Sequence, residues 1–431
     1  MFPCLIKNAF VKVTPNTNEY FFCFSSEGMP YLTNVNESGY RILALCDGKH
    51  SIEEIIYEVN RNYDEELSRT EEKVKDFLNP LIDAKIILEN QNEIVENKII
   101  RGSMEAYMPT IISWDITDYC PLNCKHCYIN EKNCSIISKK EIDTVLEMID
   151  DSGIYQVQLT GGEALTHPEL EYIISGLINR GIVTAISTSG YFSNNTIFEI
   201  LEKIKLVKGS ILRVSLDGLK STHNKVRGKN DAYDKTMIFL KEAIKRGIPC
   251  QVETCLINQN KNELEEMIRK VKEIGVNSIE IGLLLEMGNA KRNKLHSSWN
   301  AKKYQSLLTE LNTKFGSDEF RIRQLERKDR KNCGAGYVLC HITSALEVKP
   351  CAMLEINLGN LHKESMEKIM IKWGRVFHDL EGPQSKFCQK CEEKEMCNNC
   401  SAAGFNTKDK VQYCKWYEYL KTILKKHESA E

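Results

Sequence analysis

Short apolar runs alternate with longer amphipathic stretches from about residue 110 onwards, which predicts strands and helices in turn. Glycines stand where four of the helices should stop, at Gly153, Gly181, Gly247 and Gly275. The predicted strands cover residues 110–116, 155–159, 183–187, 211–216, 249–256 and 278–284. The predicted helices cover residues 138–151, 167–180, 194–205, 232–246 and 262–274. Repeated units of this kind indicate an α/β fold, with a parallel sheet curled into a partial (β/α)6 TIM-like barrel.

The first hundred residues have a different pattern and are predicted to form a separate module. Ser51 and Glu54 have the spacing of a helix-starting capping box. Strands are predicted at 19–25 and 29–33 around a Glu27-Gly28 turn, helices at 38–46, 51–61 and 68–84, and a last strand at 85–89. This order of elements is winged-helix-like. The polar stretch 90–101 is interpreted as a linker.

The charge of this module changes what a winged-helix-like unit would be expected to bind. Residues 1–100 carry ten Lys and Arg against seventeen Asp and Glu, so the module should repel phosphate, and no nucleic acid is expected as a partner. An exposed strand edge can instead accept a peptide as an added strand. A plain packing or dimerisation domain is the alternative.

The composition of the chain limits the class of protein further. The chain has 431 residues, a net charge of -2 and 42% hydrophobic residues, enough for two or three domains. No apolar run approaches the ~18 residues that a membrane span requires, and the first residues lack a signal-peptide pattern, so a cytoplasmic protein without a membrane partner is expected. The 17 cysteines are clustered, and in a reducing compartment this favours metal ligation over disulfides.

One short loop carries the sharpest chemical signal. Cys120, Cys124 and Cys127 are spaced C-x3-C-x2-C directly after the first predicted barrel strand. A [4Fe–4S] cube normally takes four thiolates, so three on one loop would leave one iron open to a cofactor. A zinc knuckle, or a chance triplet, is the alternative from the spacing alone. His126, inside this loop, is interpreted as a loop filler.

Further motifs follow the next strands at the end where barrel enzymes place their chemistry. They are Thr160-Gly161-Gly162-Glu163, Ser187-Thr188-Ser189-Gly190 and Ser215-Leu216-Asp217-Gly218, with Arg227-Gly228 soon after. Each is weak by itself. In this order, together with the cysteine loop, the chain resembles radical S-adenosylmethionine (SAM) enzymes.

The resemblance implies roles for individual residues. The open iron held by Cys120, Cys124 and Cys127 would chelate SAM and cleave it to a 5′-deoxyadenosyl radical. Backbone and carboxylate oxygens of Gly161, Gly162 and Glu163 would accept the SAM amino group. The remaining SAM contacts would come from Ser215 and Arg227 on the carboxylate, from Ser187, Ser189 and Asp217 on ribose or carboxylate, and from Tyr128 and Leu283 near adenine. Ser189 stands where many relatives have Asn, and Asp217 has a turn acceptor as its alternative role.

Eight more cysteines crowd the C-terminal region and could ligate two zinc ions or two iron–sulfur cubes. Cys333-Gly334-Ala335-Gly336, Pro350-Cys351 and Leu358-Gly359-Asn360-Leu361 resemble the signature of the SPASM domain, which holds two auxiliary [4Fe–4S] clusters. By that resemblance one cluster takes Cys333, Cys340, Cys351 and Cys400, and the other takes Cys388, Cys391, Cys397 and Cys414. The x2 spacing before Cys400 departs from the usual x3, and Leu346 replaces a usual glycine. The altered spacing motivates the hypothesis of an open iron on the first auxiliary cluster.

Structural roles are expected for most of the other cysteines. Cys23, Cys46, Cys250 and Cys255 are expected in the core. Cys134 is placed near the cluster loop.

The three parts together resemble maturases of ribosomally made peptides, with residues 1–100 as the precursor-peptide (leader) recognition domain, 108–310 as the radical SAM barrel and 311–431 as a bridging helix and SPASM domain. The expected reaction is an intramolecular thioether from a cysteine sulfur to a carbon, as in sactipeptide and ranthipeptide synthases. The expected cofactors are SAM and three [4Fe–4S] clusters, and the expected partners are a precursor peptide and an electron donor such as flavodoxin or ferredoxin. A carbon–carbon cross-link is the runner-up, followed by an anaerobic sulfatase-maturing enzyme. An iron–sulfur or zinc regulator with a winged helix is the alternative from another class.

Overall fold

The computed structural model describes residues 1–6, 8–15, 19–26, 29–89, 98–129, 135–295, 298–323, 331–384 and 386–428. Its centre is a ten-stranded sheet in the order β13-β12-β11-β10-β9-β8-β7-β14-β15-β16. All strands from β7 to β13 pair in parallel with their neighbours. The six predicted barrel strands are confirmed as β7 (Ile111–Thr117), β8 (Gln156–Gly161), β9 (Val183–Thr188), β10 (Ile211–Ser215), β11 (Cys250–Leu256) and β12 (Ser278–Leu283).

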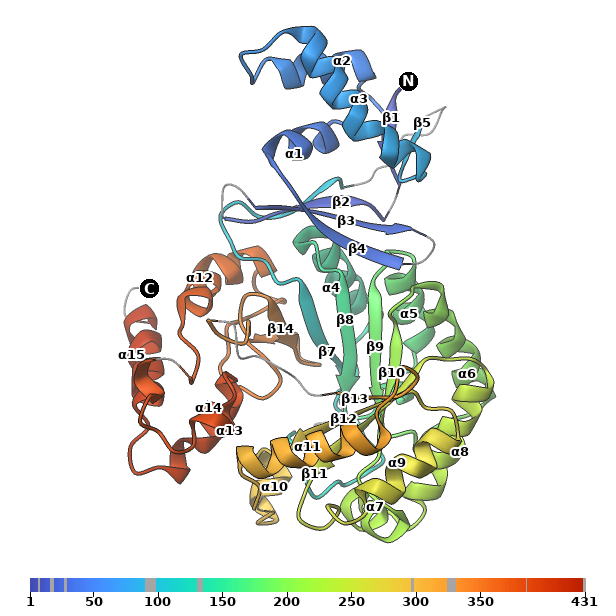
Figure 1. The fold of residues 1–431 in the computed structure, drawn as a ribbon, viewed down its shortest axis with the longest axis vertical. Helices are drawn as coiled ribbons and strands as arrows, with labels where there is room; N and C mark the ends of the chain where they lie inside the picture. Colours follow the sequence, from blue (N-terminus) through green and yellow to red (C-terminus); the bar gives the residue numbers. More distant parts are fainter. Residues whose placement is uncertain are drawn as a thin grey trace.

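Helices cover one face of this sheet (Figure 1). The five predicted helices are confirmed as α4 (Lys139–Ser152), α5 (Leu170–Ile178), α6 (Asn195–Glu202), α8 (Ala232–Lys245) and α9 (Leu264–Glu273). Short 3-10 helices follow β8 and α6, as η1 (Ala164–Thr166) and η2 (Lys203–Leu206). The capping box of Ser138 and Glu141 starts α4, and Gly153 ends it at a left-handed φ of 64°. One further helix, α7 (Lys220–Arg227), was not predicted. Its buried residues are His223, Val226 and Arg227, so it has no apolar stripe for the sequence pattern to reveal.

Side chains of the strands alternate between the helix-covered face and the inner face of the curled sheet. On β7, Ile112, Trp114 and Ile116 join the main apolar core. The intervening Ser113, Asp115 and Thr117 are polar, yet each is at most 9% exposed. The inner face is therefore polar and closed off from bulk water along β7.

Both ends of the barrel sheet are extended by strands that were not predicted. β13 (Arg321–Arg323) pairs with β12. On the other side β14 (Leu339–Ile342), from the cysteine-rich tail, pairs in parallel with β7, so the tail is continuous with the barrel sheet. The rest of the C-terminal region comprises β15 (Glu347–Lys349), β16 (Gly359–Asn360), α10 (Gly288–Arg292), α11 (Ala301–Phe315), α12 (Met366–Asp379), η3 (Lys386–Cys388), α13 (Lys394–Cys397), α14 (Ser401–Thr407), η4 (Lys408–Lys410) and α15 (Lys415–Glu428). The domain boundary expected between residues 310 and 311 falls within α11.

The N-terminal module contains the three predicted helices, α1 (Glu37–Ala44), α2 (Ile52–Asn60) and α3 (Leu67–Asp83), and the capping box of Ser51 and Glu54 starts α2. A four-stranded sheet has the order β4-β3-β2-β6, in which β3 (Tyr20–Ser26) and β4 (Met29–Val35) match the two predicted strands. β1 (Pro3–Leu5), β2 (Phe10–Val13) and β6 (Ile100–Gly102) were not predicted, and the linker prediction is wrong for residues 100 and 101 because β6 pairs with β2. β5 (Ile87–Glu89) confirms the last predicted strand and pairs with β1. The predicted Glu27-Gly28 turn lies outside the described residues.

The module is attached where the first barrel strands begin, which is the end opposite the predicted chemistry (Figure 1). Lys12 of β2 is 3% exposed, and its ammonium donates to the carbonyls of Pro109 (2.7 Å) and Gly153 (3.2 Å). Arg101 lies over the ring of Phe10 and bonds Asp150 of α4 at 3.0 Å. These contacts fix the module to the barrel through buried polar groups, which tolerate little displacement. In the described part of the chain, no helix is long and apolar enough to cross a bilayer.

Burial lowers the pKa of Lys12 from 10.5 to about 7, so the folded protein binds one proton fewer than the unfolded chain between these pH values. Stability should therefore rise with pH in that interval, by about 1.4 kcal/mol per unit at most. From pH 7 to pH 9 we expect the unfolding free energy of the wild type to increase by about 2 kcal/mol relative to that of Lys12→Met. Urea unfolding at several pH values measures it. Lys49→Met, which changes an exposed lysine of the same module, is the control and should show no such slope.

Candidate functional site

The cysteine loop has no regular secondary structure between β7 and residue 129, and neighbouring strand ends hold its backbone in place. Gly162 and Glu163, after β8, donate their backbone N–H groups to the carbonyls of Thr117 (2.7 Å) and Tyr119 (2.8 Å). Further along the loop, Lys125 donates its N–H to the carbonyl of Val226 in α7 at 2.8 Å. The loop is thus tied to two separate βα connections.

The two glycines of Gly-Gly-Glu are required by this close approach of two backbones. A Cβ atom on Gly161 would collide with the carbonyl oxygen of Thr117, and one on Gly162 with that of Tyr119. Gly161 also has a φ of +122°, a region that side chains disfavour. This motif therefore positions the cysteine loop, whatever it also contributes to SAM.

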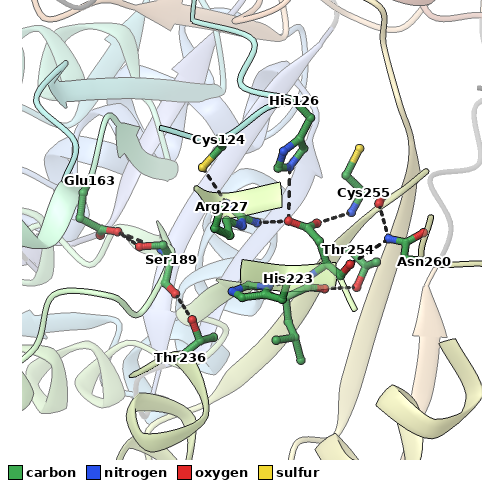
Figure 2. A network of polar contacts seen from close by, with 12 residues as sticks. Cys124, His126, Glu163, Ser189, His223, Arg227, Thr236, Thr254, Cys255 and Asn260 are labelled. Carbon is green, nitrogen blue, oxygen red and sulfur yellow. Dashed lines mark hydrogen bonds and ion pairs between the residues drawn. The ribbon is translucent and has the colours of Figure 1, made fainter. Parts of the chain in front are cut away.

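Glu163 is 1% exposed, and its carboxylate is engaged within the protein. It accepts hydrogen bonds from the hydroxyl of Thr188 (2.6 Å) and from the backbone N–H of Ser189 (2.9 Å), and the Ser189 hydroxyl also donates to it. The carbonyl of Ser189 in turn accepts from Thr236 of α8 at 2.7 Å, as Figure 2 shows. The carboxylate thus joins the ends of β8 and β9. Thr188 stands inside the predicted motif Ser187-Thr188-Ser189-Gly190 but was given no role, and Thr236 was missed because a threonine within a helix carries no distinctive signal.

A second buried network lies under the loop (Figure 2). The carboxylate of Asp217, which is 1% exposed, pairs with Arg227 at 2.7 Å and with the imidazole of His126 at 3.4 Å. Arg227 also reaches the sulfur of Cys124, at 3.7 Å. His126 is therefore part of the site and not a mere loop filler. The guanidinium of Arg227, predicted to hold the SAM carboxylate, already binds a carboxylate inside the protein.

Charges in this network shift the ionisation of its members. Burial raises the pKa of Asp217, but the guanidinium of Arg227 above all, together with a backbone hydrogen bond from Cys255, outweighs it and leaves that pKa below its ordinary value. Burial lowers the pKa of His223 to about 3, so this imidazole is neutral, and the backbone N–H of Asp217 donates to its Nδ1 at 3.0 Å. The Cys124 thiol has a pKa raised by burial, against the effect of Arg227. An ionised Asp217 thus keeps a guanidinium next to one cluster thiol.

α10 supports the other side of the loop. Asn289 donates its backbone N–H to the carbonyl of Cys127 (2.8 Å) and its side-chain amide to that of Cys124 (2.9 Å). Glu286, just before α10, bonds Asn406 through its N–H at 2.9 Å and pairs with Lys410 at 2.8 Å. Asn289 was missed because the pattern of hydrophobic residues predicts no helix here. These contacts connect the loop to the cysteine-rich tail.

The other predicted SAM contacts lie on the strands that surround the loop. Ser187 accepts from Gln158 of β8 at 3.0 Å, and Ser215 lies beside Glu253 in the parallel register of β10 and β11. Leu283 ends β12 and is packed against the main core. Loss of water raises the pKa of the Tyr128 hydroxyl well above its ordinary value, and a hydrogen bond with Thr160 opposes this shift. The geometry brings the predicted residues to one end of the sheet, and their contacts with SAM remain predictions.

Electrostatic effects among the eight tail thiols link them in two sets, and the assignment of these sets to two auxiliary clusters stays a prediction. Burial raises the pKa of Cys340 and of Cys351 to about 12, with Cys351 acting on Cys340, and with Cys400 and Cys333 acting on Cys351. The thiols of Cys388, Cys391, Cys397 and Cys414 form the second mutually interacting set. Buried thiols that raise one another's pKa stay protonated until a metal displaces the protons. Two four-thiol sets fit two cubes, and Cys400 supplies a fourth thiol to the first.

The spread of these side chains bears on the zinc alternative. No three Cys, His, Asp or Glu side chains among the described residues are gathered tightly enough to hold one metal ion. A zinc knuckle converges its ligands on a single ion, whereas a cube distributes thiolates over separate irons. Which metal the two sets of thiols would bind stays a prediction.

The remaining cysteine predictions are largely met. Cys23, Cys46 and Cys250 are buried as expected. Cys255 is only partly buried, and its backbone N–H donates to Asp217 at 3.1 Å. Cys134 lies outside the described residues.

Comparison with known proteins agrees with this geometry. Residues 114–271 match the radical SAM superfamily, and residues 27–87 match coenzyme PQQ synthesis protein D (PqqD). The antilisterial bacteriocin subtilosin biosynthesis protein AlbA of Bacillus subtilis is 26% identical over 400 residues, which cover 89% of this chain and 88% of AlbA. An AdoMet-dependent heme synthase of Methanosarcina barkeri is also 26% identical, over 69% of this chain and 92% of its own. The structure of Streptococcus suis SuiB bound to precursor peptide SuiA superposes with a TM-score of 0.68 at 13% identity, covering 96% of this chain and 98% of SuiB.

Fold and site together define an α/β enzyme built to hold an iron–sulfur cluster at the ends of parallel strands. The chain is a radical SAM enzyme, and it carries a PqqD domain at its N-terminal side.

Replacing Gly162 tests the support of the loop. A Cβ there would push Tyr119 and the following Cys120 away from the strand end, so Gly162→Ala should lose the loop cluster, or about four irons per chain. Iron analysis of anaerobically reconstituted protein measures this. Gly247→Ala is the control, because it also alters a glycine at positive φ (+68°) but meets nothing within 4 Å. Equal iron content in both variants would show that the loop tolerates displacement.

Proposed function

We propose that the chain is a maturase that cross-links a ribosomally synthesised peptide, with a thioether from a cysteine sulfur to a carbon as the bond formed. The observation that carries the proposal is a PqqD domain fixed to a radical SAM barrel whose tail holds two further sets of four cysteines. AlbA, named for the biosynthesis of a bacteriocin, and SuiB, named with a bound precursor peptide, support a peptide substrate. The heme synthase relative matches a smaller share of the chain than AlbA does.

The leader of the peptide would bind along β4. This strand is the edge of the N-terminal sheet, and its exposed residues include Tyr31 (47%) and Leu32 (43%). An unpaired edge offers backbone donors and acceptors to an extended peptide, and exposed apolar side chains add contact area. We also propose that the fold of this module is winged-helix-like.

Because the module is fixed at the end of the sheet opposite the cysteine loop, leader and reacting residue must be separated along the peptide. Fifteen extended residues span roughly 50 Å, which is ample for a path around the barrel. Affinity would thus reside in the leader, and the chemistry in a small site.

The site residues have defined tasks in this scheme. SAM bound to the loop cluster would supply the radical that removes a hydrogen atom from the core peptide. Cys120, Cys124 and Cys127 would hold that cluster, and Arg227, fixed by Asp217, would place positive charge beside it. In this scheme SAM would be contacted by Gly161, Gly162, Glu163, Ser187, Ser189 and Ser215. Two auxiliary [4Fe–4S] clusters, held by Cys333, Cys340, Cys351 and Cys400 and by Cys388, Cys391, Cys397 and Cys414, would bring the total to three.

Anaerobic incubation with SAM, dithionite and the cysteine-containing peptide encoded beside the gene tests the function. We expect 5′-deoxyadenosine and a peptide lighter by two hydrogens, and fragmentation should place the new bond on the cysteine. A bond between two carbons would instead support the carbon–carbon alternative. Formation of 5′-deoxyadenosine without any change in the peptide would contradict the proposal. Flavodoxin or ferredoxin would replace dithionite as donor.

Leader binding at β4 has its own test. Leu32→Lys places a charge on the open edge, as natural sheets do to block strand addition. We expect the variant to bind the labelled leader segment about tenfold more weakly, a change of ~1.4 kcal/mol, measured by fluorescence anisotropy. Ile371→Lys is the control, since Ile371 is 48% exposed on α12, away from β4. Unchanged affinity in Leu32→Lys would place the leader elsewhere.

A further inference from the structure

A buried carboxylate–imidazole pair on the inner face of the sheet has no part in the sites described above. Asp115 of β7 and His341 of β14 lie on paired strands, and Asp115 Oδ2 is 3.2 Å from His341 Nε2. Their side chains are only 12% and 3% exposed. In the described part of the chain, the other polar atom of each, Asp115 Oδ1 and His341 Nδ1, is buried without a hydrogen-bond partner.

Such orphaned atoms need an explanation, because buried polar groups in folded proteins almost always have a partner. Leaving one unsatisfied costs about 1–3 kcal/mol. Here both ends of a single pair are unsatisfied. A carboxylate that presents a free oxygen inside a catalytic barrel is ready to accept a proton from a bound molecule.

The location of the pair narrows the kind of molecule that it would meet. The hydroxyl of Tyr128 is hydrogen-bonded to Thr160. The nearby charges of Asp115, Cys127 and Cys351 all raise its pKa. Cys127 belongs to the loop that would hold the SAM cluster, and Cys351 to the first auxiliary set. Asp115 is on β7, the strand that leads into the cysteine loop, and its partner His341 directly follows Cys340 of the first proposed auxiliary set on β14. A substrate that meets a radical at one cluster and gives an electron to another has to lie in this region.

The chemistry proposed above requires a proton acceptor. Forming a thioether breaks one C–H and one S–H bond and makes one S–C bond. One hydrogen leaves as an atom, taken by the 5′-deoxyadenosyl radical. The other would leave as a proton, and an oxidised auxiliary [4Fe–4S] cluster, if held by the tail cysteines, would be the acceptor for the remaining electron. A carbon–carbon cross-link has the same balance, so the need for a base does not depend on which bond forms.

We propose that Asp115 is the catalytic base that accepts this proton, and that His341 is the positioning residue that fixes its carboxylate toward the peptide. The proposal rests on the proposed function. His341 binds one oxygen of Asp115, which leaves the other oxygen directed to the substrate.

Asp115→Asn preserves the shape of the side chain and removes the base. We expect the variant to form 5′-deoxyadenosine while cross-linked peptide falls about 100-fold, within the usual range for loss of a general base. The ratio of 5′-deoxyadenosine to product should rise accordingly. Iron content, the EPR spectrum of the reduced clusters and the dissociation constant of the peptide should stay at wild-type values. Asp143→Asn is the matched control, because Asp143 lies on α4 and bonds Tyr172 away from the inner face.

The His341 variants separate positioning from packing. His341→Gln retains a donor for Asp115 and should keep most of the product, whereas His341→Ala should uncouple 5′-deoxyadenosine from product as Asp115→Asn does. A wild-type ratio in Asp115→Asn would overturn the proposal. A parallel loss of iron and of 5′-deoxyadenosine in that variant would also overturn it, by showing a structural role. If the wild-type enzyme itself makes no cross-link while forming 5′-deoxyadenosine, the proposed function fails, and the assignment of Asp115 fails with it.

Discussion

The cysteine loop depends on backbone hydrogen bonds that come from other parts of the chain. A segment without helix or strand cannot fix three thiolates by its own conformation, because each residue keeps about 1–2 kcal/mol of backbone freedom until it is tied down. Here Gly162 and Glu163 bind its start, Val226 its middle and Asn289 its end. The donors and acceptors belong to elements that the parallel sheet already aligns. The site is therefore rigid only when the barrel is complete.

The same requirement explains why so many charged groups are buried under the loop. Asp217 and Arg227 form a pair that would cost several kcal/mol to desolvate separately, and each is further bound by His126, Cys124 or backbone groups. Removing any one partner would leave another charge buried without compensation. The network therefore links the ends of β10 and β11 to the cysteine loop more specifically than apolar packing could.

The sequence predicted the parts of this architecture that are local. Strand–helix alternation located all six central strands, since each run of apolar residues faces its own helices. Pairings between distant segments have no such periodic signal. β14 joins β7 across more than two hundred residues, and β6 pairs with β2 within a stretch that is polar in composition. The cysteines and the Gly-Gly-Glu motif were recognisable by spacing, and their roles as cluster and SAM ligands stay predictions. The roles of His126, Thr188 and Asn289 were not recognisable, because they come from partners that only the fold brings near.

The pairing of β14 with β7 also constrains how a peptide could react. β7 leads directly into the loop of the SAM cluster, and β14 carries Cys340 of the first auxiliary set. Hydrogen bonds between adjacent strands hold their separation to about 4.8 Å, so the two cluster sites cannot move apart as separate domains could. In the proposed function, the sheet would fix the position of an intermediate between them, and selectivity would come from how the peptide is threaded past Asp115 and Tyr128. A leader held at the opposite end of the same sheet would set the length of peptide between the leader and the reacting residue. The distance from the leader to the reacting residue would thus be measured by the barrel itself.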